Sequence, residues 1–298
     1  MRQYIMNKPK VSIVLPCYNG AAMIGEAIES VIAQTFKDWE LIIVNDCSTD
    51  NTLEVAESYT AKDKRIRVFS NEKNSKLPAT LNHGFREARG EYWTWTSDDN
   101  LLLPEMIEEL CKFLDENPEV GFVISDLANI DIDGNILSYD LLPNNVAEQL
   151  PLRNCVGASF MYRSFVAQKA GGYREDLFLV EDYEYWIRLL SYTKFAHIPK
   201  VLYQYRIHSQ SLTSTRQKEI AENLLHLRLL YLDIMEKRLA NDTQTLSLYY
   251  YGILDGVRGV ERVKYYIRFA KKLPFKIGIR YICIHIPHKL YKTYKKNK

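Results

Sequence analysis

The sequence lacks several features that mark common protein classes. Its five cysteines are scattered and no two are spaced Cys-x-x-Cys, so neither a zinc site nor a disulfide framework is indicated. Residues 1–10 contain no apolar segment of the kind that marks a secretory signal. No run of roughly 18 apolar residues occurs. We therefore expect a chain without a transmembrane helix, in a reducing cytoplasm.

Acidic residues are missing from the C-terminal end. Residues 262–298 contain twelve Lys or Arg and no Asp or Glu, and because the whole chain carries +2, residues 1–261 carry −10. This asymmetry suggests a basic tail with an acidic partner surface. Basic residues interleave with aromatic and aliphatic ones, which favours peripheral attachment to an anionic membrane at the inner face of the cell. A helical cap on the rest of the chain is the alternative, and no nucleic-acid-reading motif is present.

The chain is long enough and apolar enough for a sizeable core, with 298 residues of which 47% are hydrophobic. Short apolar runs alternate with helical patterns up to residue 126, which predicts an α/β fold. Because the strands are nearly continuous in apolar character, we expect a mostly parallel sheet covered by helices on both faces. The expected strands are 11–16, 41–44, 66–69, 92–96 and 120–125, with helices over about 23–32, 51–59, 78–88 and 104–114.

Two adjacent carboxylates, Asp98 and Asp99, follow the fourth expected strand. Ligands bind at the carboxyl edge of an open α/β sheet, and a bound cation relieves the repulsion between two like charges. The pair therefore favours a divalent metal that bridges to an anionic ligand. A solvated turn with an aspartate helix cap is the alternative. Asp46 and Asp126 end two other expected strands, so we expect the acids to converge on one cleft.

The pattern is less regular after residue 126. Asp133-Gly134 is a turn signal, and Glu181-Asp182 begins a helix with apolar residues on one face. Residues 203–208 alternate like a strand, and the chain from about residue 216 is helical in pattern. These changes predict an N-terminal arm, two halves of one α/β domain and a helical, basic extension, with bounds 1–10, 11–126, 127–215 and 216–298.

Five segments of the chain carry a recognisable order of motifs: 11–20, 45–50, 97–100, 181–182 and 205–212. The loop after the first strand is not G-x-G-x-x-G, which weighs against a dinucleotide-binding Rossmann protein. Taken in this order, the five segments resemble the family 2 glycosyltransferases of the GT-A fold. The resemblance implies transfer of a sugar from a nucleotide diphosphate sugar to a hydroxyl acceptor, with inversion at the anomeric carbon and a need for Mn²⁺ or Mg²⁺.

The resemblance assigns residues to the nucleotide-sugar site. Asp46 matches an aspartate that accepts a hydrogen bond from N3–H of uracil, and an ionised carboxylate is an acceptor only, which favours uridine or thymidine over guanine. Lys76 matches a cation near the base or the phosphates. Cys47 departs from the usual glycine and loses its freedom at positive φ. The base and ribose pocket is lined by Pro16, Tyr18 and Asn19.

The resemblance also assigns the metal and the chemistry. Asp98 contacts the ribose or a metal-bound water, Asp99 binds the metal, and His208 completes the metal or diphosphate site. The earlier aspartate of the family's DXD motif is replaced by Thr96. The metal neutralises charge on the departing diphosphate. Asp182 is the general base that takes the proton of the acceptor hydroxyl.

The sequence thus predicts a metal-dependent inverting hexosyl- or N-acetylhexosaminyl-transferase with a UDP-sugar as favoured donor. Its acceptor is a glycan or a lipid-linked glycan, in bacterial surface polysaccharide or glycolipid assembly. An inactive sugar-nucleotide-binding module and a sugar nucleotidyltransferase are the alternatives. The second alternative would carry a glycine-rich basic loop after the first strand, which residues 16–20 lack. The sugar, the acceptor, the linkage and the oligomeric state are not encoded in any motif.

Overall fold

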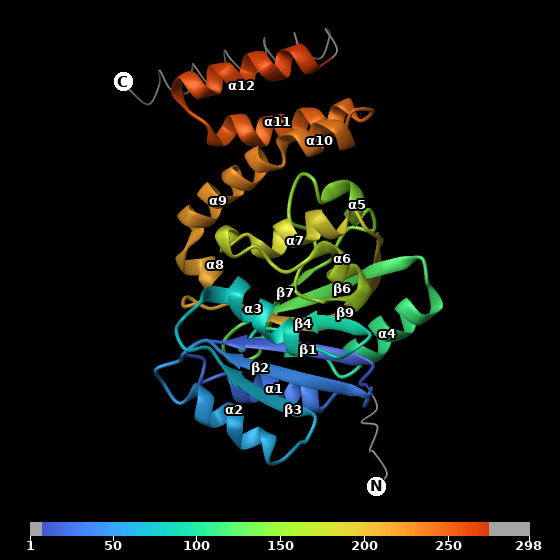
Figure 1. Cartoon of the computed structure of the whole chain (residues 1–298), viewed down its shortest axis with the longest axis vertical. Coiled ribbons are helices and arrows are strands. Elements are labelled where there is room, and N and C mark those ends of the chain that lie inside the picture. Colours follow the sequence, from blue (N-terminus) through green and yellow to red (C-terminus); the bar gives the residue numbers. More distant parts are fainter. Residues whose placement is uncertain (1–7, 274–298) are drawn as a thin grey trace. The chain divides into compact units, whose positions relative to one another are not determined.

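The computed structural model describes residues 8–273 (Figure 1). The chain divides into two compact units, Met1–Gln217 and Lys218–Lys298. The first unit is built on a nine-stranded sheet. The described part of the second unit consists of helices joined by short connections.

The sheet is mixed and mostly parallel, with strand order β3-β2-β1-β4-β8-β6-β9-β5 and β7 paired to β6. β1 lies between β2 and β4, and both pairings are parallel, as is that of β2 with β3. β8 is antiparallel to both β4 and β6 and joins the two halves of the sheet. The strands are β1 (Val11–Cys17), β2 (Trp39–Asn45), β3 (Ile66–Ser70), β4 (Tyr92–Trp95), β5 (Leu101–Leu102), β6 (Val120–Ile130), β7 (Ile136–Asp140), β8 (Phe160–Arg163) and β9 (Lys194–Arg206).

Helices cover both faces of this sheet, as the sequence predicts (Figure 1). Successive residues of a strand point to opposite faces. Ile13 and Leu15 of β1 pack in one apolar cluster with α1 and α4, whereas Val14 faces Gly84 of α3. The helices of this unit are α1 (Ile24–Ile32), α2 (Thr52–Thr60), α3 (Lys76–Glu87), α4 (Met106–Glu116), α5 (Val146–Gln149), α6 (Ser164–Ala170), α7 (Glu181–Leu189) and α8 (Leu212–Thr215), with a 3-10 turn at Glu175–Leu177.

An aromatic cluster holds α7 against the sheet. Trp186 of α7 is fully buried, and its ring centroid lies 4.9 Å from that of Phe122 on β6 and 4.7 Å from that of Phe160 on β8. Aromatic pairs at such distances add to the free energy of burial. The N-terminus of α7, which carries Asp182, is therefore positioned by the core.

One sequence-based expectation about the sheet is wrong. Asp126 does not end a strand, because β6 continues for four residues beyond it and pairs with β7. Its carboxylate Oδ1 lies 2.7 Å from Nε2 of His197 and accepts a hydrogen bond from the backbone N–H of Leu142 at 2.8 Å. Asp126 therefore holds β6, β9 and the following loop together and is not a free acid of the expected cleft.

The second unit contains α9 (Gln217–Leu230), α10 (Leu232–Arg238), α11 (Thr243–Gly256) and α12 (Gly259–Lys272). Tyr250 of α11 stacks on Phe269 of α12, with ring centroids 3.8 Å apart. Across residues 8–273, each helix falls short of the length and apolar character that crossing a membrane requires.

Two glycine substitutions should change stability in opposite directions. A Cβ on Gly84 would lie 2.4 Å from Val14 Cγ1, so Gly84→Ala must push α3 off the sheet and should cost about 1–3 kcal/mol of unfolding free energy. A Cβ on Gly25 of α1 meets only the Tyr59 hydroxyl at 3.6 Å. Gly25→Ala should therefore stabilise the fold by about 0.5–1 kcal/mol through helix propensity. Urea unfolding of both variants measures this, and a stabilising Gly84→Ala would contradict the tight packing of α3.

Candidate functional site

Three loops meet at the carboxyl edge of β1, β2 and β4. These strands are parallel neighbours, so the residues that follow each of them lie at the same edge. Gly20 lies so close to Asp98 that a Cβ on the glycine would be 2.1 Å from the carboxylate Oδ2. The first loop therefore leaves room for this carboxylate only because position 20 has no side chain.

The loop after β1 is tied to the loop after β2 by Asn19. Its Oδ1 accepts a hydrogen bond from the backbone N–H of Thr49 at 2.8 Å, and its own N–H donates to Ser48 Oγ at 3.0 Å. Pro16 is buried within β1. Tyr18 is 48% exposed, so it is the side chain of this loop that offers a ring surface to a ligand.

Asp46 anchors the segment before α3. Its buried carboxylate accepts hydrogen bonds from Asn71 Nδ2 at 2.8 Å and from the backbone N–H groups of Ser75 and Lys76 at 2.8 and 2.9 Å. A carboxylate accepts about four hydrogen bonds, so one position remains for a ligand donor. The side chain of Lys76 is exposed. Cys47 adopts φ +60°, so the loop keeps the conformation that glycine would favour.

Asp98 is half-buried and accepts a hydrogen bond from the backbone N–H of Tyr18. Burial, and then the charge of Asp99, raise the pKa of Asp98 to about 7. Desolvation is the larger cause, and the like-charge pair that the sequence shows adds to it. A cation at this edge would lower the pKa of Asp98 again and stabilise both carboxylates.

Asp99 and His208 form the second half of this acidic edge. Asp99 Oδ2 lies 3.0 Å from His208 Nε2, whereas Oδ1 is buried and has no hydrogen-bond partner among residues 8–273. The described residues contain no cluster of three or more His, Cys, Asp or Glu side chains arranged around a metal. Mg²⁺ at phosphate-transfer sites is often held by one or two carboxylates and completed by substrate phosphates. The unpartnered Oδ1 beside Asp98 fits such a cation.

Arg206 stabilises the loop that carries Asp99. It is only 2% exposed, and its Nε donates to the backbone oxygen of Asp99 at 2.9 Å. The backbone N–H of Arg206 donates to Asn100 Oδ1 at 2.8 Å, and its side-chain Nη2 pairs with the Glu26 carboxylate at 2.7 Å. The guanidinium nitrogens are therefore already occupied by contacts that hold the Asp99–Asn100 loop in place. A role for Arg206 in direct contact with the diphosphate does not fit this geometry.

Asp182 lies in the first turn of α7, and hydrogen bonds orient both of its carboxylate oxygens. Oδ1 accepts a hydrogen bond from the backbone N–H of Tyr183 at 2.6 Å, and Oδ2 accepts one from Asn154 Nδ2 at 2.9 Å. Burial raises the pKa of Asp182, opposed by these hydrogen bonds. Asn154 is 28 residues away in the chain, so no local pattern in the sequence could have paired the two.

Glu181 is the second carboxyl of this turn. It is 3% exposed, and its Oε2 has no hydrogen-bond partner within the described part of the chain. Burial, and then the charge of Asp182, raise the pKa of Glu181 to about 8. The two carboxyls titrate as one system.

The family model Glycosyl transferase family 2 matches residues 12–171, which is more than half of the chain. The chain belongs to glycosyltransferase family 2. An uncharacterised glycosyltransferase of Rickettsia typhi is 32% identical over 224 residues, which cover 72% of this chain and 69% of the relative. The putative glycosyltransferase EpsE of Bacillus subtilis is 33% identical over 187 residues, or 60% of this chain and 66% of EpsE.

Solved structures share the GT-A fold of this glycosyltransferase. A crystal structure of S. aureus TarS aligns with a TM-score of 0.67 and 18% identity, covering 97% of this chain and 92% of that chain. The mannosyltransferase PcManGT of Pyrobaculum calidifontis, in complex with GDP-Man and Mn²⁺, aligns with a TM-score of 0.61 and 15% identity, covering 97% and 84%. At these identities the likeness shows the fold alone.

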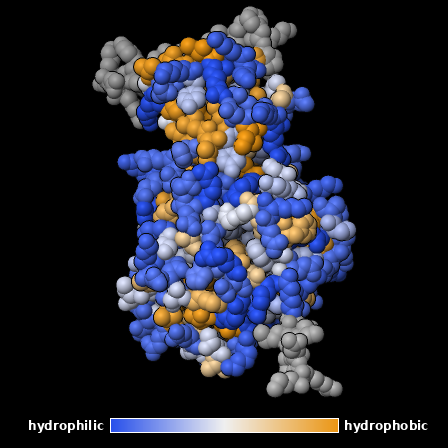
Figure 2. Space-filling model, in the orientation of Figure 1, coloured by the Kyte–Doolittle hydropathy of each residue, from blue (hydrophilic) through white to orange (hydrophobic). Residues whose placement is uncertain are grey.

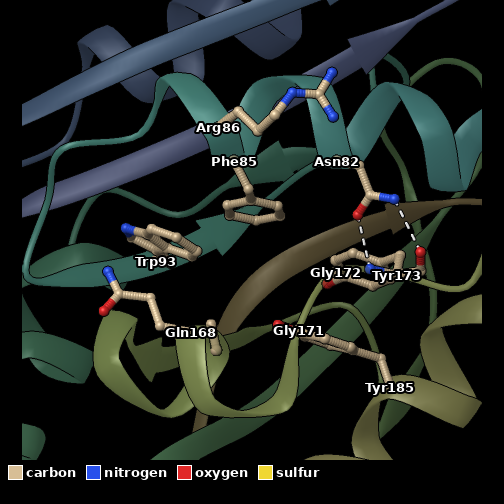
Figure 3. Close-up of a pocket in the computed structure, with 10 residues that line it drawn as sticks. Asn82, Phe85, Arg86, Trp93, Gln168, Gly171, Gly172, Tyr173 and Tyr185 are labelled. Atoms are coloured by element: carbon tan, nitrogen blue, oxygen red, sulfur yellow. Dashed lines mark hydrogen bonds between the residues drawn. The ribbon is translucent and has the colours of Figure 1, made fainter.

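A pocket of about 360 Å³ lies elsewhere in the glycosyltransferase, between α3 and the C-terminal end of α6 (Figure 3). Its rings form a stack in which Phe85 lies 5.1 Å from Trp93 and 6.0 Å from Tyr173, centroid to centroid. Tyr173 turns its hydroxyl out of the stack to accept a hydrogen bond from Trp95 Nε1 at 3.0 Å. The residues that line this pocket include none of the acids or loops described above.

We predict that Glu181→Gln changes how stability depends on pH. The folded pKa of Glu181 lies near 8 and the unfolded one near 4.5, so its contribution to stability is present below the unfolded value and is lost as the pH rises through 8. Glutamine cannot ionise, so the variant should gain about 4 kcal/mol relative to the parent between pH 5 and pH 9. Urea unfolding at both pH values measures this. The exposed Glu175→Gln is the control, and a pH-independent difference for Glu181→Gln would contradict the prediction.

Proposed function

We propose that this family 2 glycosyltransferase is a metal-dependent, inverting enzyme that moves a hexosyl or N-acetylhexosaminyl group from a nucleotide diphosphate sugar to a hydroxyl acceptor. The observation that carries the proposal is the acidic edge at β4. There Asp98 has a raised pKa, and Asp99 keeps a buried oxygen that no described residue pairs. Such an edge is poised for a cation and, through it, for a diphosphate.

The donor binds, in this proposal, across the loops after β1 and β2. Asp46 keeps one acceptor position, which suits N3–H of a uracil base, and Tyr18 offers an exposed ring. Asn19 shapes this loop, and Lys76 lies at the start of α3 with its ammonium exposed. A structure of TarS contains UDP-GlcNAc and that of PcManGT contains GDP-Man, so the fold accommodates either base and the choice rests on the residues near Asp46.

Asp99 and His208 would hold Mn²⁺ or Mg²⁺, with Asp98 beside them. When bound, the ion would neutralise charge on the departing diphosphate. The protein's own part is to keep the three side chains in place. Asp99 is fixed through its backbone oxygen by Arg206 and through Oδ2 by His208, so its Oδ1 is the oxygen left for the ion.

Asp182 is the general base of the proposed reaction. The acceptor oxygen forms a bond to the anomeric carbon as the bond from that carbon to the diphosphate oxygen breaks, and the diphosphate leaves with the electron pair. Asp182 takes the proton of the acceptor hydroxyl, while Asn154 keeps its carboxylate oriented. General base catalysis of this kind contributes roughly 10²- to 10⁴-fold.

Each part of the chain has its own task in the proposed reaction. Residues 11–126 bind the donor, residues 127–215 bind the acceptor and supply the base, and the extension 216–298 attaches the enzyme to an anionic membrane surface. A lipid-linked or glycan acceptor in bacterial surface polysaccharide or glycolipid assembly follows from that placement on the inner face of the cell membrane. Most of the basic tail, residues 274–298, lies outside the described residues.

Titration calorimetry with UDP, TDP and GDP, each with and without Mn²⁺, tests the donor site. We expect binding of UDP or TDP that requires Mn²⁺ and that Asp99→Ala abolishes, because the variant removes the unpartnered oxygen. Asp133→Ala, which removes an exposed acid in the turn between β6 and β7, is the matched control and should bind as the parent does.

Asp182→Asn complements this experiment. It should bind the nucleotide normally and lose at least about 10²-fold in the release of nucleoside diphosphate from the sugar donor. Absence of nucleotide binding to the parent protein would overturn the proposed donor site. Binding without any product in the parent would favour an inactive module, and pyrophosphate as product would favour a nucleotidyltransferase.

Arg206→Lys should weaken Mn²⁺ binding in the presence of UDP by about 10- to 100-fold, as loss of an outer-shell partner typically does. Lysine cannot reproduce the forked contacts to the Asp99 backbone and Glu26. Arg163→Lys is the control, because Arg163 is buried and bonds the backbone oxygens of Val120 and Leu114 instead. Paramagnetic resonance of free Mn²⁺ measures the affinity. Equal Mn²⁺ affinities for the two variants would show that Arg206 acts on stability alone.

A further inference from the structure

Helix α12 has an inward face that is well anchored within its own unit. Phe269 is fully buried and stacks on Tyr250 of α11. Arg268 donates to Asp233 of α10 at 2.5 Å, and Lys272 pairs with Glu236 at 3.4 Å. The stack and the ion pairs fix the rotation of α12 about its axis, so its opposite face is also fixed.

The opposite face of α12 carries an exposed apolar stripe. Val260, Val263 and Ile267 are 73%, 58% and 52% exposed. They are spaced by three and four residues, which places them in one row along the helix. Hydrophobic side chains are visible on the surface of this helical unit (Figure 2). Single exposed apolar residues are common, but an aligned row of them marks a surface that contacts something apolar.

Basic side chains flank this stripe. Lys264 follows Val260 by one turn, and Lys271 follows Ile267 by one turn, and both lysines are exposed. The one acidic residue of α12, Glu261, pairs with Lys264 at 2.7 Å. Beyond it the chain has no further acidic residue. The stripe therefore lies beside positive charge.

We propose that the α12 stripe, Val260, Val263 and Ile267 with Lys264 and Lys271, is the surface by which this enzyme lies on an anionic membrane. Within residues 8–273 no helix is long and apolar enough to cross a membrane, and an exposed apolar row beside lysines suits the interfacial position of an amphipathic helix. There the valines and the isoleucine enter the boundary between headgroups and acyl chains, and the lysines contact anionic headgroups. This inference rests on the membrane location proposed above and is independent of the donor and metal sites.

Charge argues against the other occupants of the stripe. A symmetric contact with a second copy would bring Lys264 and Lys271 of both copies toward one another, and like charges at an interface are costly. Residues 274–298 contain Lys and Arg but no acidic residue, so they offer no complement either. An anionic lipid surface supplies both the apolar depth and the opposite charge.

Co-sedimentation of the full chain with vesicles tests the proposal. One set of vesicles contains phosphatidylcholine alone and the other an equimolar mixture with phosphatidylglycerol. The triple variant V260S/V263S/I267S should lower the partition coefficient onto the mixed vesicles by about tenfold or more. The variant K264Q/K271Q should lower binding to the mixed vesicles and leave binding to phosphatidylcholine unchanged. The control I234S/L248S removes two other exposed apolar residues, 54% and 52% exposed, and should bind as the parent does.

Several outcomes would overturn the proposal. Unchanged vesicle binding by the triple variant would show that α12 is not the contact surface. A change in oligomeric state by light scattering, without a change in vesicle binding, would assign the stripe to a second copy. An equal loss of vesicle binding by the control variant I234S/L248S would show that any exposed apolar side chain of the helical unit contributes, and not the α12 stripe in particular. Nucleotide binding measured on the same variants should match the parent, so failure here is distinguishable from failure of the donor site.

Discussion

Repulsion between Asp98 and Asp99 is the constraint on which the site depends. Burial, and then the charge of Asp99, raise the pKa of Asp98, so two ionised carboxylates side by side at this edge are unfavourable. The surrounding structure holds them there nonetheless: Gly20 gives one of them space, and Arg206 fixes the backbone of the other. Such unfavourable placement is typical of sites that await a ligand of opposite charge. The family membership of the chain makes a nucleotide sugar its class of donor, and its binding at this edge together with a cation belongs to the proposed function.

The position of the proposed base, Asp182, depends on how α7 packs against the sheet. Trp186 fills the aromatic core between α7 and the sheet, so the first turn of α7 has little freedom. Asp182 and Glu181 share that turn, and burial raises the pKa of both carboxyls. The same core therefore decides where the proposed base lies.

Much of the first half could be predicted because its signals are local. The strands through residue 95 and the helices between them follow from apolar runs that a short window contains. Asp126 shows where this fails. A strand end is not decided by the strand itself, and β6 continues because β7 and β9 pair with its far end. Asn154 was missed for the same reason, since its partner Asp182 is distant in the chain. A surface or diphosphate-binding position for Arg206 does not fit the structure, because its contacts with the Asp99–Asn100 loop also join distant parts of the chain.

By itself, the sequence determined the family, the alternation of strands and helices, and the chemical types at the carboxyl edge, because each of these depends on residues close together in the chain. Only the tertiary structure decided which of those residues are available to a ligand. Asp46 is largely occupied by backbone N–H groups, Asp126 is held by His197, and Asp99 keeps one oxygen that no residue of the described part of the chain pairs. Whether a carboxylate is available to a ligand depends on hydrogen-bond partners from distant parts of the chain, which only folding brings close. Burial then shifts the pKa of the carboxylates that are left without such partners.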